Sequence, residues 1–352
     1  MIFAFILFSF LIESAYTLTE DHFEADYEEL VIPLQKKHFN LRSFQSFDKT
    51  RISYFAPKLK RSQKALIILT GRTEPAVSYF EHIHDLLPLG HDIYILDHRG
   101  QGFSDRPHLK KEFKNKYNHP EYQKGHIKSF SHYTKDFEFF LKKNLKSYKT
   151  IDVMAHSMGA AVTLDLLLST NIKINKIVLT VPMLKIPLPG PYSFTKTLLH
   201  FLNSIGFSES YIPGEGLKNP KPEFEKNRVS SSKTRWTMDR KIDNEFRETS
   251  LGGVTFGWVN EAVKVSEKIF NNRDSFNRSI LLFDVDTELI SDNSRTESFC
   301  RANSKCQYIK LKDAKHEVLI ERDEIRNLMF QKIYDYFEAG PFTPGSRHSL
   351  SR

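Results

Sequence analysis

Short apolar runs alternate along this chain with stretches whose apolar residues recur at helical spacing. Runs that are short and aliphatic or β-branched, as buried strands are, occupy residues 65–71, 92–98, 150–155, 176–182 and 279–285. Helical patterns stand between some of them, at residues 76–87 and 132–145. This alternation predicts the α/β class, with a mainly parallel sheet that carries helices on both faces.

Both ends of this pattern predict further elements. The stretch at residues 39–57 predicts a hairpin of two strands. Near the C-terminus a helix is predicted to carry one apolar face, made of Ile325, Leu328, Met329, Ile333 and Phe337.

One segment, residues 185–277, breaks the alternation because it has no buried-strand signal and holds many prolines and glycines between amphipathic helical pieces. It stands between two core strands, so we expect a helical cap over the C-terminal edge of the sheet, where open α/β sheets bind ligands. The predicted organisation is a core of residues 16–184 and 278–340, a cap of residues 185–277, and a flexible tail of residues 341–352.

The N-terminus begins with an apolar run that is too short to span a bilayer as a helix. With Ser14 and Ala15 behind it, the run is typical of a signal peptide of residues 1–15, although a basic n-region is missing. We therefore expect export, to the periplasm, the medium or a membrane-associated state. The alternative is a buried or membrane-dipping helix, which would leave the protein cytoplasmic or peripheral to the inner membrane.

The net charge of +8 is spread over the chain without an arginine-rich tract. Nucleic acid binding needs a concentrated basic face or a reading motif, and neither is visible, so nucleic acid is not an expected partner. An anionic membrane surface fits diffuse charge better, which leaves peripheral membrane contact open. The two cysteines, Cys300 and Cys306, have no histidine or second cysteine pair near them at zinc spacing, and a disulfide and two free thiols stay equally open.

Candidate chemistry begins at residues 150–168, which read TIDVMAHSMGAAVTLDLLL. The pattern indicates a strand, a sharp turn with Ser157 at its tip, and a helix. A nucleophile elbow holds its serine in strained backbone, and the residues two before and two after it must be small. Ala155 and Gly159 meet that requirement. We therefore interpret Ser157 as a nucleophile, with a structural turn serine as the alternative.

A serine hydroxyl needs a base, and in proteins with such an elbow the chain order is serine, acid, histidine. His316 lies after the last predicted strand and before the final helix. Apart from His348 in the tail, it is the only histidine C-terminal to residues 279–285. His316 is therefore the candidate base, with a solvated loop histidine as the alternative.

The acid should follow the strand at residues 279–285, where four carboxylates stand: Asp284, Asp286, Glu288 and Asp292. Asp284 lies within the strand run, and Asp292 could cap the next helix. Glu288 is the preferred candidate because its longer arm could reach the imidazole from the loop. Asp286 is the runner-up.

Several segments together resemble the lysophospholipase and monoacylglycerol lipase branch of the α/β-hydrolases, nearest to the bacterial lysophospholipases. They lie at residues 71–106, which contain DHRGQGFSDR, and at 124–141, 155–161, 252–262, 280–293 and 312–327. The resemblance implies an α/β-hydrolase fold, Ser157 as the nucleophile and His316 as the base, and it implies no metal or organic cofactor. Glu288 falls where many members carry aspartate, but the bacterial group carries glutamate there and also alanine two residues before the serine.

An oxyanion hole needs two backbone N–H donors. One is expected from Met158, just after the nucleophile, and the other from the loop at residues 70–73, where the resemblance assigns it to Arg72. The Arg72 side chain is expected to be solvated, with contact to a phosphate as the alternative. Residues 97–99, Asp-His-Arg, are interpreted as a structural turn because Gly100 and Gly102 follow them.

These features predict a serine esterase that hydrolyses single-acyl lipid esters, a lysophospholipid or a monoacylglycerol, through an acyl-enzyme. The alternatives are a thioesterase or an aminopeptidase-like serine hydrolase of the same fold, and a catalytically inactive binding scaffold. Within the predicted cap, residues 193–207 place apolar side chains at helical spacing: Phe194, Leu198, Phe201, Leu202 and Ile205. That face would pack on the core or line the pocket, or else contact a membrane.

Overall fold

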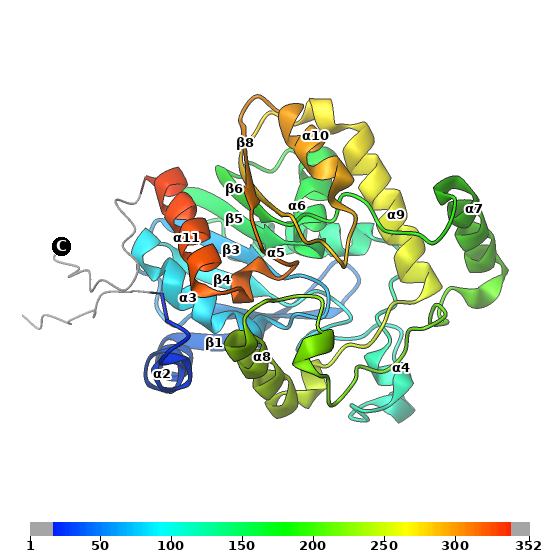
Figure 1. Cartoon of the computed structure of the whole chain (residues 1–352), viewed down its shortest axis with the longest axis horizontal. Coiled ribbons are helices and arrows are strands. Elements are labelled where there is room, and N and C mark those ends of the chain that lie inside the picture. The colour runs from blue at the N-terminus through cyan, green and yellow to red at the C-terminus, as the bar shows by residue number, and fades with distance from the viewer. Residues whose placement is uncertain (1–16, 339–352) are drawn as a thin grey trace, which may run out of the picture.

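The computed structural model describes residues 17–338, so the predicted signal peptide (1–15) and tail (341–352) lie outside the described residues. One eight-stranded sheet forms the centre, in the order β1-β2-β4-β3-β5-β6-β7-β8 (Figure 1). The strands are β1 Phe39–Gln45, β2 Arg51–Pro57, β3 Lys64–Leu69, β4 Asp92–Leu96, β5 Thr150–His156, β6 Lys176–Thr180, β7 Ser279–Val285 and β8 Cys306–Leu311. The predicted α/β-hydrolase architecture is confirmed.

Strand pairing follows the prediction closely. β1 and β2 form the expected antiparallel hairpin, and β2 joins the rest of the sheet by antiparallel pairing with β4. All further neighbours are parallel, from β4 to β8. From β3, the chain first adds β4 on one side of the strand and then β5 on the other. The topological switch point of the sheet therefore lies between β3 and β5, at their C-terminal ends.

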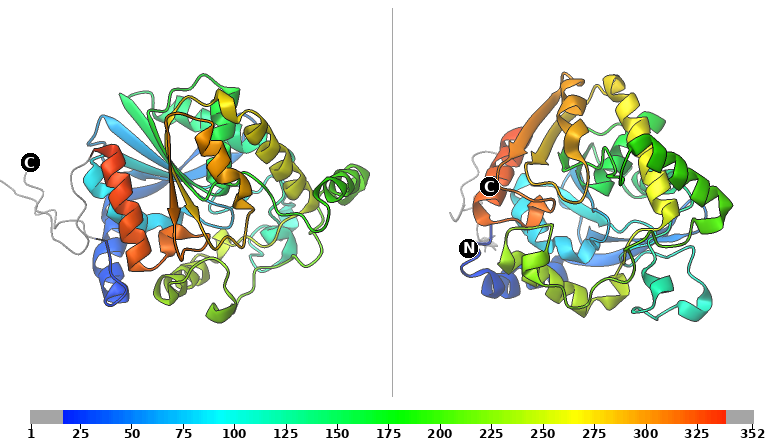
Figure 2. Two further views of the ribbon diagram at one scale, coloured as in Figure 1. Left: turned by 45° about the horizontal axis from the view of Figure 1, so that its top comes forward. Right: turned by 45° about the vertical axis from the view of Figure 1, so that its right-hand side comes forward.

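Helices cover both faces of the sheet (Figures 1 and 2). The α-helices are α1 Phe23–Asp26, α2 Ile32–His38, α3 Phe80–Leu86, α4 Pro120–Gln123, α5 Ser131–Asn144, α6 Met158–Ser169, α7 Tyr192–Leu202, α8 Lys233–Glu245, α9 Phe256–Asn271, α10 Thr296–Arg301 and α11 Asp323–Phe337. The π-helical segments η1 (Tyr27–Val31) and η5 (Asn203–Phe207) continue α1 and α7. Among residues 17–338, no helix is long and apolar enough to cross a membrane.

Alternate residues of each central strand face opposite sides, so two apolar clusters form. Ile67 and Leu69 of β3 belong to the cluster with α5, α6 and α9, while Leu66 and Ile68 belong to the cluster with α3, α8 and α11. The apolar face of α11 is shifted from the predicted one. Leu328 is 43% exposed and Phe337 is partly buried, whereas Phe330, Tyr334 and Tyr336 are buried beside Ile325, Met329 and Ile333.

The segment predicted as a cap, residues 185–277, contains helices and loops, and its two β-bridges, Gly125 with Val254 and Tyr211 with Thr255, are isolated ones. Its last helix, α9, packs against α6 in the core cluster, so this part of the segment covers the sheet. The boundaries of a separate cap stay a prediction.

The interior carries several buried charges in the turn after β4. Arg99 is bound by Asp48 and Asp136, and the Asp97 carboxylate accepts the N–H of Ala76 and Phe103. Gly102 is required here, because a Cβ would come within 1.9 Å of that carboxylate and its φ is +54°. This turn is structural, as its sequence indicates. At the sheet edge, Cys300 and Cys306 form a disulfide that joins α10 to β8.

Candidate active site

The backbone at Ser157 is held in an uncommon conformation. Ser157 stands between β5 and α6 with φ +47° and ψ −109°, where a residue with a Cβ is strained. Its N–H donates to Thr180 O of β6 at 3.0 Å. Gly159 must be glycine, because a Cβ there would lie 2.4 Å from the Leu69 carbonyl oxygen of β3. The elbow predicted from the sequence is therefore present in both its strain and its close approach.

The structure brings Ser157, His316 and Glu288 into one hydrogen-bonded chain. His316 Nε2 lies 3.0 Å from Ser157 Oγ, and His316 Nδ1 lies 2.7 Å from Glu288 Oε2. A carboxylate can only accept, so Nδ1–H donates to Glu288 and leaves Nε2 free to accept the serine proton. Ser157 is 8% exposed and His316 is 4% exposed, which shields the chain from bulk water.

The loop after β7 fixes Glu288. Its second oxygen, Oε1, accepts the N–H of Ile290 at 2.6 Å and of Ser291 at 2.8 Å. Burial raises the pKa of the Glu288 carboxyl, but the hydrogen bond and charge of His316 and these two N–H donors outweigh it and hold the pKa below its ordinary value. Glu288 is therefore ionised at neutral pH.

The three other candidate acids lie elsewhere. Asp286 is exposed and accepts the N–H of Asp313, which turns it away from the imidazole. Asp284 is buried in β7 and accepts from Tyr308 and Asn293. Asp292 caps the short 3-10 helix that follows it. Of the four, only Glu288 contacts His316.

The backbone N–H groups of Arg72 and Met158, the candidate oxyanion donors, come after two neighbouring strands, β3 and β5. β3 pairs with β5 in parallel, with Leu69 opposite Ala155, so Arg72 and Met158 stand just beyond adjacent strand ends. The loop approaches the elbow closely, because a Cβ on Gly71 would lie 2.9 Å from the His156 ring. This topology allows both backbone N–H groups to serve one oxygen atom.

The Arg72 side chain is not solvated, which corrects the prediction. Its Nη2 donates to Gly252 O at 2.9 Å and Gly253 O at 2.6 Å, and its guanidinium lies over the Trp258 ring. Burial lowers the pKa of Arg72 to about 10. The sequence gave no direct sign of this, because the two carbonyls are about 180 residues away in the chain.

A second polar cluster lies behind the elbow and was not predicted. Glu74 accepts the N–H of Gly71 at 3.1 Å and the hydroxyl of Tyr79, and it lies 3.2 Å from His156 Nε2. Burial raises the pKa of Glu74, but His156 and Tyr79 lower it to about 2. Through the N–H of Gly71, the Glu74 side chain thus holds the loop at residues 70–73, which carries the candidate oxyanion donor Arg72. A carboxylate three residues after Gly71 is the only sequence signal that points to it.

Glu317, the residue after His316, faces the same cluster. Its pKa is raised well above the ordinary value by burial and by the charges of Glu74 and Asp239. Two carboxyl groups, Glu74 and Glu317, therefore stand beside the site, and the charge of Glu74 favours the neutral form of Glu317.

Comparisons with known proteins give the same picture. The family model for the serine aminopeptidases, S33, matches residues 60–323. A protein named probable lysophospholipase L2 from Haemophilus influenzae is 30% identical over 277 residues, which cover 77% of this chain and 82% of that protein. Lysophospholipase L2 from Escherichia coli is 26% identical over 318 residues, which cover 86% of this chain and 89% of that protein.

Among solved structures, a soluble variant of monoglyceride lipase from Saccharomyces cerevisiae in complex with a substrate analogue superposes with a TM-score of 0.64. The match covers 87% of this chain and 97% of that chain at 16% identity. Identity at this level shows a shared fold.

Proposed function

Because the chain belongs to the serine aminopeptidase S33 family, within the lysophospholipase and monoacylglycerol lipase branch of the α/β-hydrolases, we propose that it is a serine esterase of single-acyl lipid esters. The observation that carries the proposal is the chain Ser157–His316–Glu288, set on a strained elbow with hydrogen-bonding distances of 3.0 and 2.7 Å. Two relatives named lysophospholipase support the substrate class.

The proposed reaction proceeds in two steps through an acyl-enzyme. Ser157 Oγ attacks the ester carbonyl carbon while His316 Nε2 takes the hydroxyl proton. The tetrahedral oxyanion accepts the N–H groups of Met158 and Arg72, and its collapse expels the alcohol, which receives the proton from His316. A water molecule then attacks the acyl carbon while His316 Nε2 takes its proton. The bond from Ser157 Oγ to the acyl carbon breaks, His316 returns the proton to Ser157 Oγ, and the fatty acid leaves. Glu288 keeps Nδ1 protonated and stabilises the imidazolium throughout.

Substrate choice is tested by a panel of esters assayed below their micelle concentrations. We expect kcat/KM to rise about fourfold for each added methylene, the equivalent of roughly 0.8 kcal/mol of burial, until the pocket is full. Lysophospholipids and monoacylglycerols should exceed diacyl phospholipids and triacylglycerols. A flat profile, or a preference for thioesters or for peptides with a free amino terminus, would contradict the lipid proposal and favour the other members of the fold.

Contact with a lipid surface is the second part of the proposal, and it rests on α7 and η5. Four of the five residues predicted for this face are exposed, namely Phe194 (68%), Leu198, Phe201 (55%) and Ile205, and Leu202 is partly buried. The neighbouring Phe207 is exposed as well. Leu199 alone among the apolar residues of α7 is buried in the core. We refer to these five exposed residues as the α7 apolar face.

Positive charge accompanies the α7 apolar face. The loop before α4 exposes Lys110, Lys111, Lys114 and Lys116 against one acid, Glu112. Tyr211, just after η5, donates its hydroxyl to Pro120 O of α4 at 2.8 Å, and both views place α7 and α4 on the same side of the molecule (Figures 1 and 2). An apolar face and exposed lysines on the same side of the molecule fit a bilayer that contains anionic lipids.

The double variant Phe194→Ser/Phe201→Ser tests this surface. Each aromatic ring that leaves water contributes about 1.5–3 kcal/mol, so binding to phosphatidylglycerol vesicles should weaken by more than about tenfold. Hydrolysis of a monomeric short-chain ester should not change. Leu59→Ser, which alters a 65% exposed leucine between β2 and β3, is the matched control. Unchanged vesicle binding, or a change in oligomeric state instead, would overturn the assignment.

A further inference from the structure

The loop that carries His316 is bound along its length by residues 227–232, the segment that leads into α8. Glu317 N–H donates to Val229 O at 2.8 Å, and Ser230 Oγ donates to Ile320 O at 2.6 Å. Ser230 is fully buried. The placement of His316 therefore depends on a segment that is distant in sequence and that enters from the predicted cap.

The Glu321 side chain binds both the loop that carries His316 and the segment at residues 227–232. Its carboxylate is 0% exposed, and Oε1 accepts two N–H groups at 2.9 Å each, from Lys315 and from Ser231. Lys315 immediately precedes His316, and Ser231 belongs to the 227–232 segment. One oxygen atom thus ties the peptide next to the imidazole to the opposite segment. The other oxygen, Oε2, accepts the N–H of Arg322 at 3.2 Å. Burial raises the pKa of Glu321, and the three N–H donors oppose that shift.

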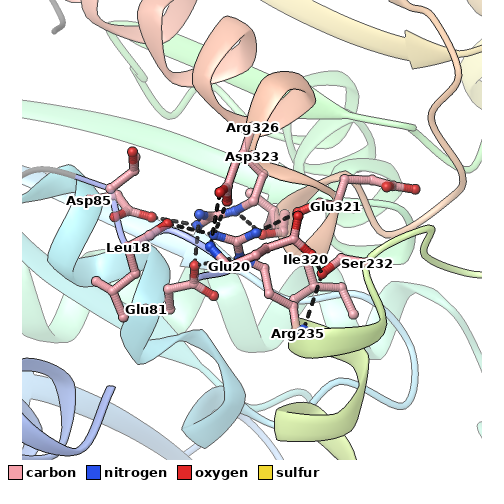
Figure 3. Close-up of polar contacts among 12 residues, drawn as sticks. Leu18, Glu20, Glu81, Asp85, Ser232, Arg235, Ile320, Glu321, Asp323 and Arg326 are labelled. Carbon is pink, nitrogen blue, oxygen red and sulfur yellow. Dashed lines mark hydrogen bonds and ion pairs between the residues drawn. The ribbon is translucent and has the colours of Figure 1, made fainter. Parts of the chain in front are cut away.

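The other side of Glu321 is fixed by a buried arginine of α8 (Figure 3). Arg235 Nη1 donates to the Glu321 carbonyl oxygen at 3.0 Å, and Nη2 donates to the Leu18 carbonyl oxygen at 2.6 Å. Its Nε donates to Glu81 Oε1 of α3 at 2.8 Å. Arg235 therefore links the backbone at Glu321 to α3 and to the segment at Leu18.

The segment at residues 17–23 also contacts α8 and α11 near Glu321. Glu20 N–H donates to Asp323 Oδ2 at 2.9 Å, and the Glu20 carboxylate accepts the Ser232 hydroxyl. Leu18 and Phe23 are buried in the core cluster on the same side of the sheet. Helix α8, α11 and the segment at residues 17–23 therefore meet at Glu321.

We propose that Glu321 is a positioning residue for His316, acting through the peptide of Lys315 and the 227–232 segment. The inference rests on the proposed esterase function, because it assigns Glu321 a role in holding the base. Glu321 donates no proton in the reaction. It sets the distance between His316 Nε2 and Ser157 Oγ by fixing the backbone from which the imidazole extends.

The test compares Glu321→Ala with Glu321→Gln. The alanine variant removes the acceptor of both N–H groups, and a displacement of about 1 Å at the reacting atoms costs on the order of 100-fold in rate. We expect kcat for a monomeric ester to fall by about that factor with KM nearly unchanged. Glutamine keeps an acceptor oxygen at the same place and should restore kcat to within about threefold of wild type.

The matched control is Asp152→Ala. Asp152 is 1% exposed and accepts the Lys176 N–H at 2.8 Å, but it lies near the start of β5, at the opposite end of the strand from Ser157. It should lower the melting temperature without lowering kcat at temperatures where it is folded. If Glu321→Ala does not fold, Ser230→Ala, which removes the bond to Ile320 O, replaces it with a smaller expected loss of kcat.

Labelling by a fluorophosphonate separates the two proposals. Absence of labelling at Ser157 in the wild-type protein would contradict the esterase function itself. Labelling of wild type and of folded Glu321→Ala at equal rates, or equal kcat losses in the Asp152 and Glu321 variants, would overturn the positioning role alone. Slower labelling of Glu321→Ala, with recovery in Glu321→Gln, supports it.

Discussion

Replacing Ser157 with alanine is expected to reduce ester hydrolysis by about a million-fold, as removal of the nucleophile does in other triads. The reason is chemical, since alanine has no atom that can form the acyl-enzyme. Folding should stay near wild type, because the Ser157 side chain bonds only to His316 and its backbone bonds to Thr180 and Ala161 are kept. The strain of the φ of +47° at this position should be similar in the variant, because serine and alanine both carry a Cβ.

The measurement is initial-rate hydrolysis of a monomeric ester, with fluorophosphonate labelling and thermal unfolding beside it. Ser266→Ala provides the control, because Ser266 is a fully buried serine of α9 whose hydroxyl donates to Ala262 O. It should keep activity and labelling. If Ser157→Ala retained a tenth of wild-type activity, the serine would not be the nucleophile and the elbow would be a structural turn.

Strand prediction succeeded because the central strands are buried on both faces. β3, β5 and β6 are short apolar runs with burial nearly throughout, so their composition alone distinguishes them. The helical segment at residues 23–38 was not predicted. Its acidic and basic residues mask the few buried ones, Phe23, Tyr27 and Val31, and helical spacing is hard to read from so few positions.

The sequence could not determine a side chain's surroundings where they come from distant parts of the chain. The apolar face of α7 has the same pattern as a packed helix, and only the fold shows that it points to solvent. Arg72 looks like a surface arginine in its own loop, and the carbonyls that hold it belong to residues 252 and 253. In both cases local sequence determines the element but not its neighbours.

The residues of the candidate site also fall into two groups, those with a local sequence pattern and those without one. Ser157 and His316 could be proposed from the sequence because each lies in a local pattern, a strand–turn–helix and a loop after the last strand. Glu74, Glu321 and Arg235 were not found, because each binds backbone groups or charges on another element and carries no motif of its own. Glu288 stood between these cases: the loop after β7 was identified, but two carboxylates in it are only two residues apart.

The choice between Glu288 and Asp286 leads to the second large expected effect. Glu288→Gln should lower turnover by about 10⁴-fold, since an amide can donate to Nδ1 and stabilise the tautomer in which Nε2 carries the proton. That tautomer cannot accept the Ser157 proton. The hydrogen bonds from Ile290 and Ser291 to the retained oxygen keep the loop in place, so the loss is one of chemistry and not of folding.

Asp286→Asn is the matched control for this variant, because it makes the same carboxylate-to-amide change two residues away. Asp286 is exposed and binds only the loop at Asp313 and the neighbouring Thr287, so its variant should stay within about threefold of wild-type kcat. Both are measured with a monomeric ester across pH 5 to 9. Because the pKa of Glu288 is held below its ordinary value, Glu288 itself titrates below this range, and the loss in Glu288→Gln should not follow a titration of Glu288. Equal losses in the two variants would leave His316 without an assigned partner, and a larger loss in Asp286→Asn would mean that the loop rearranges in solution to bring Asp286 to the imidazole.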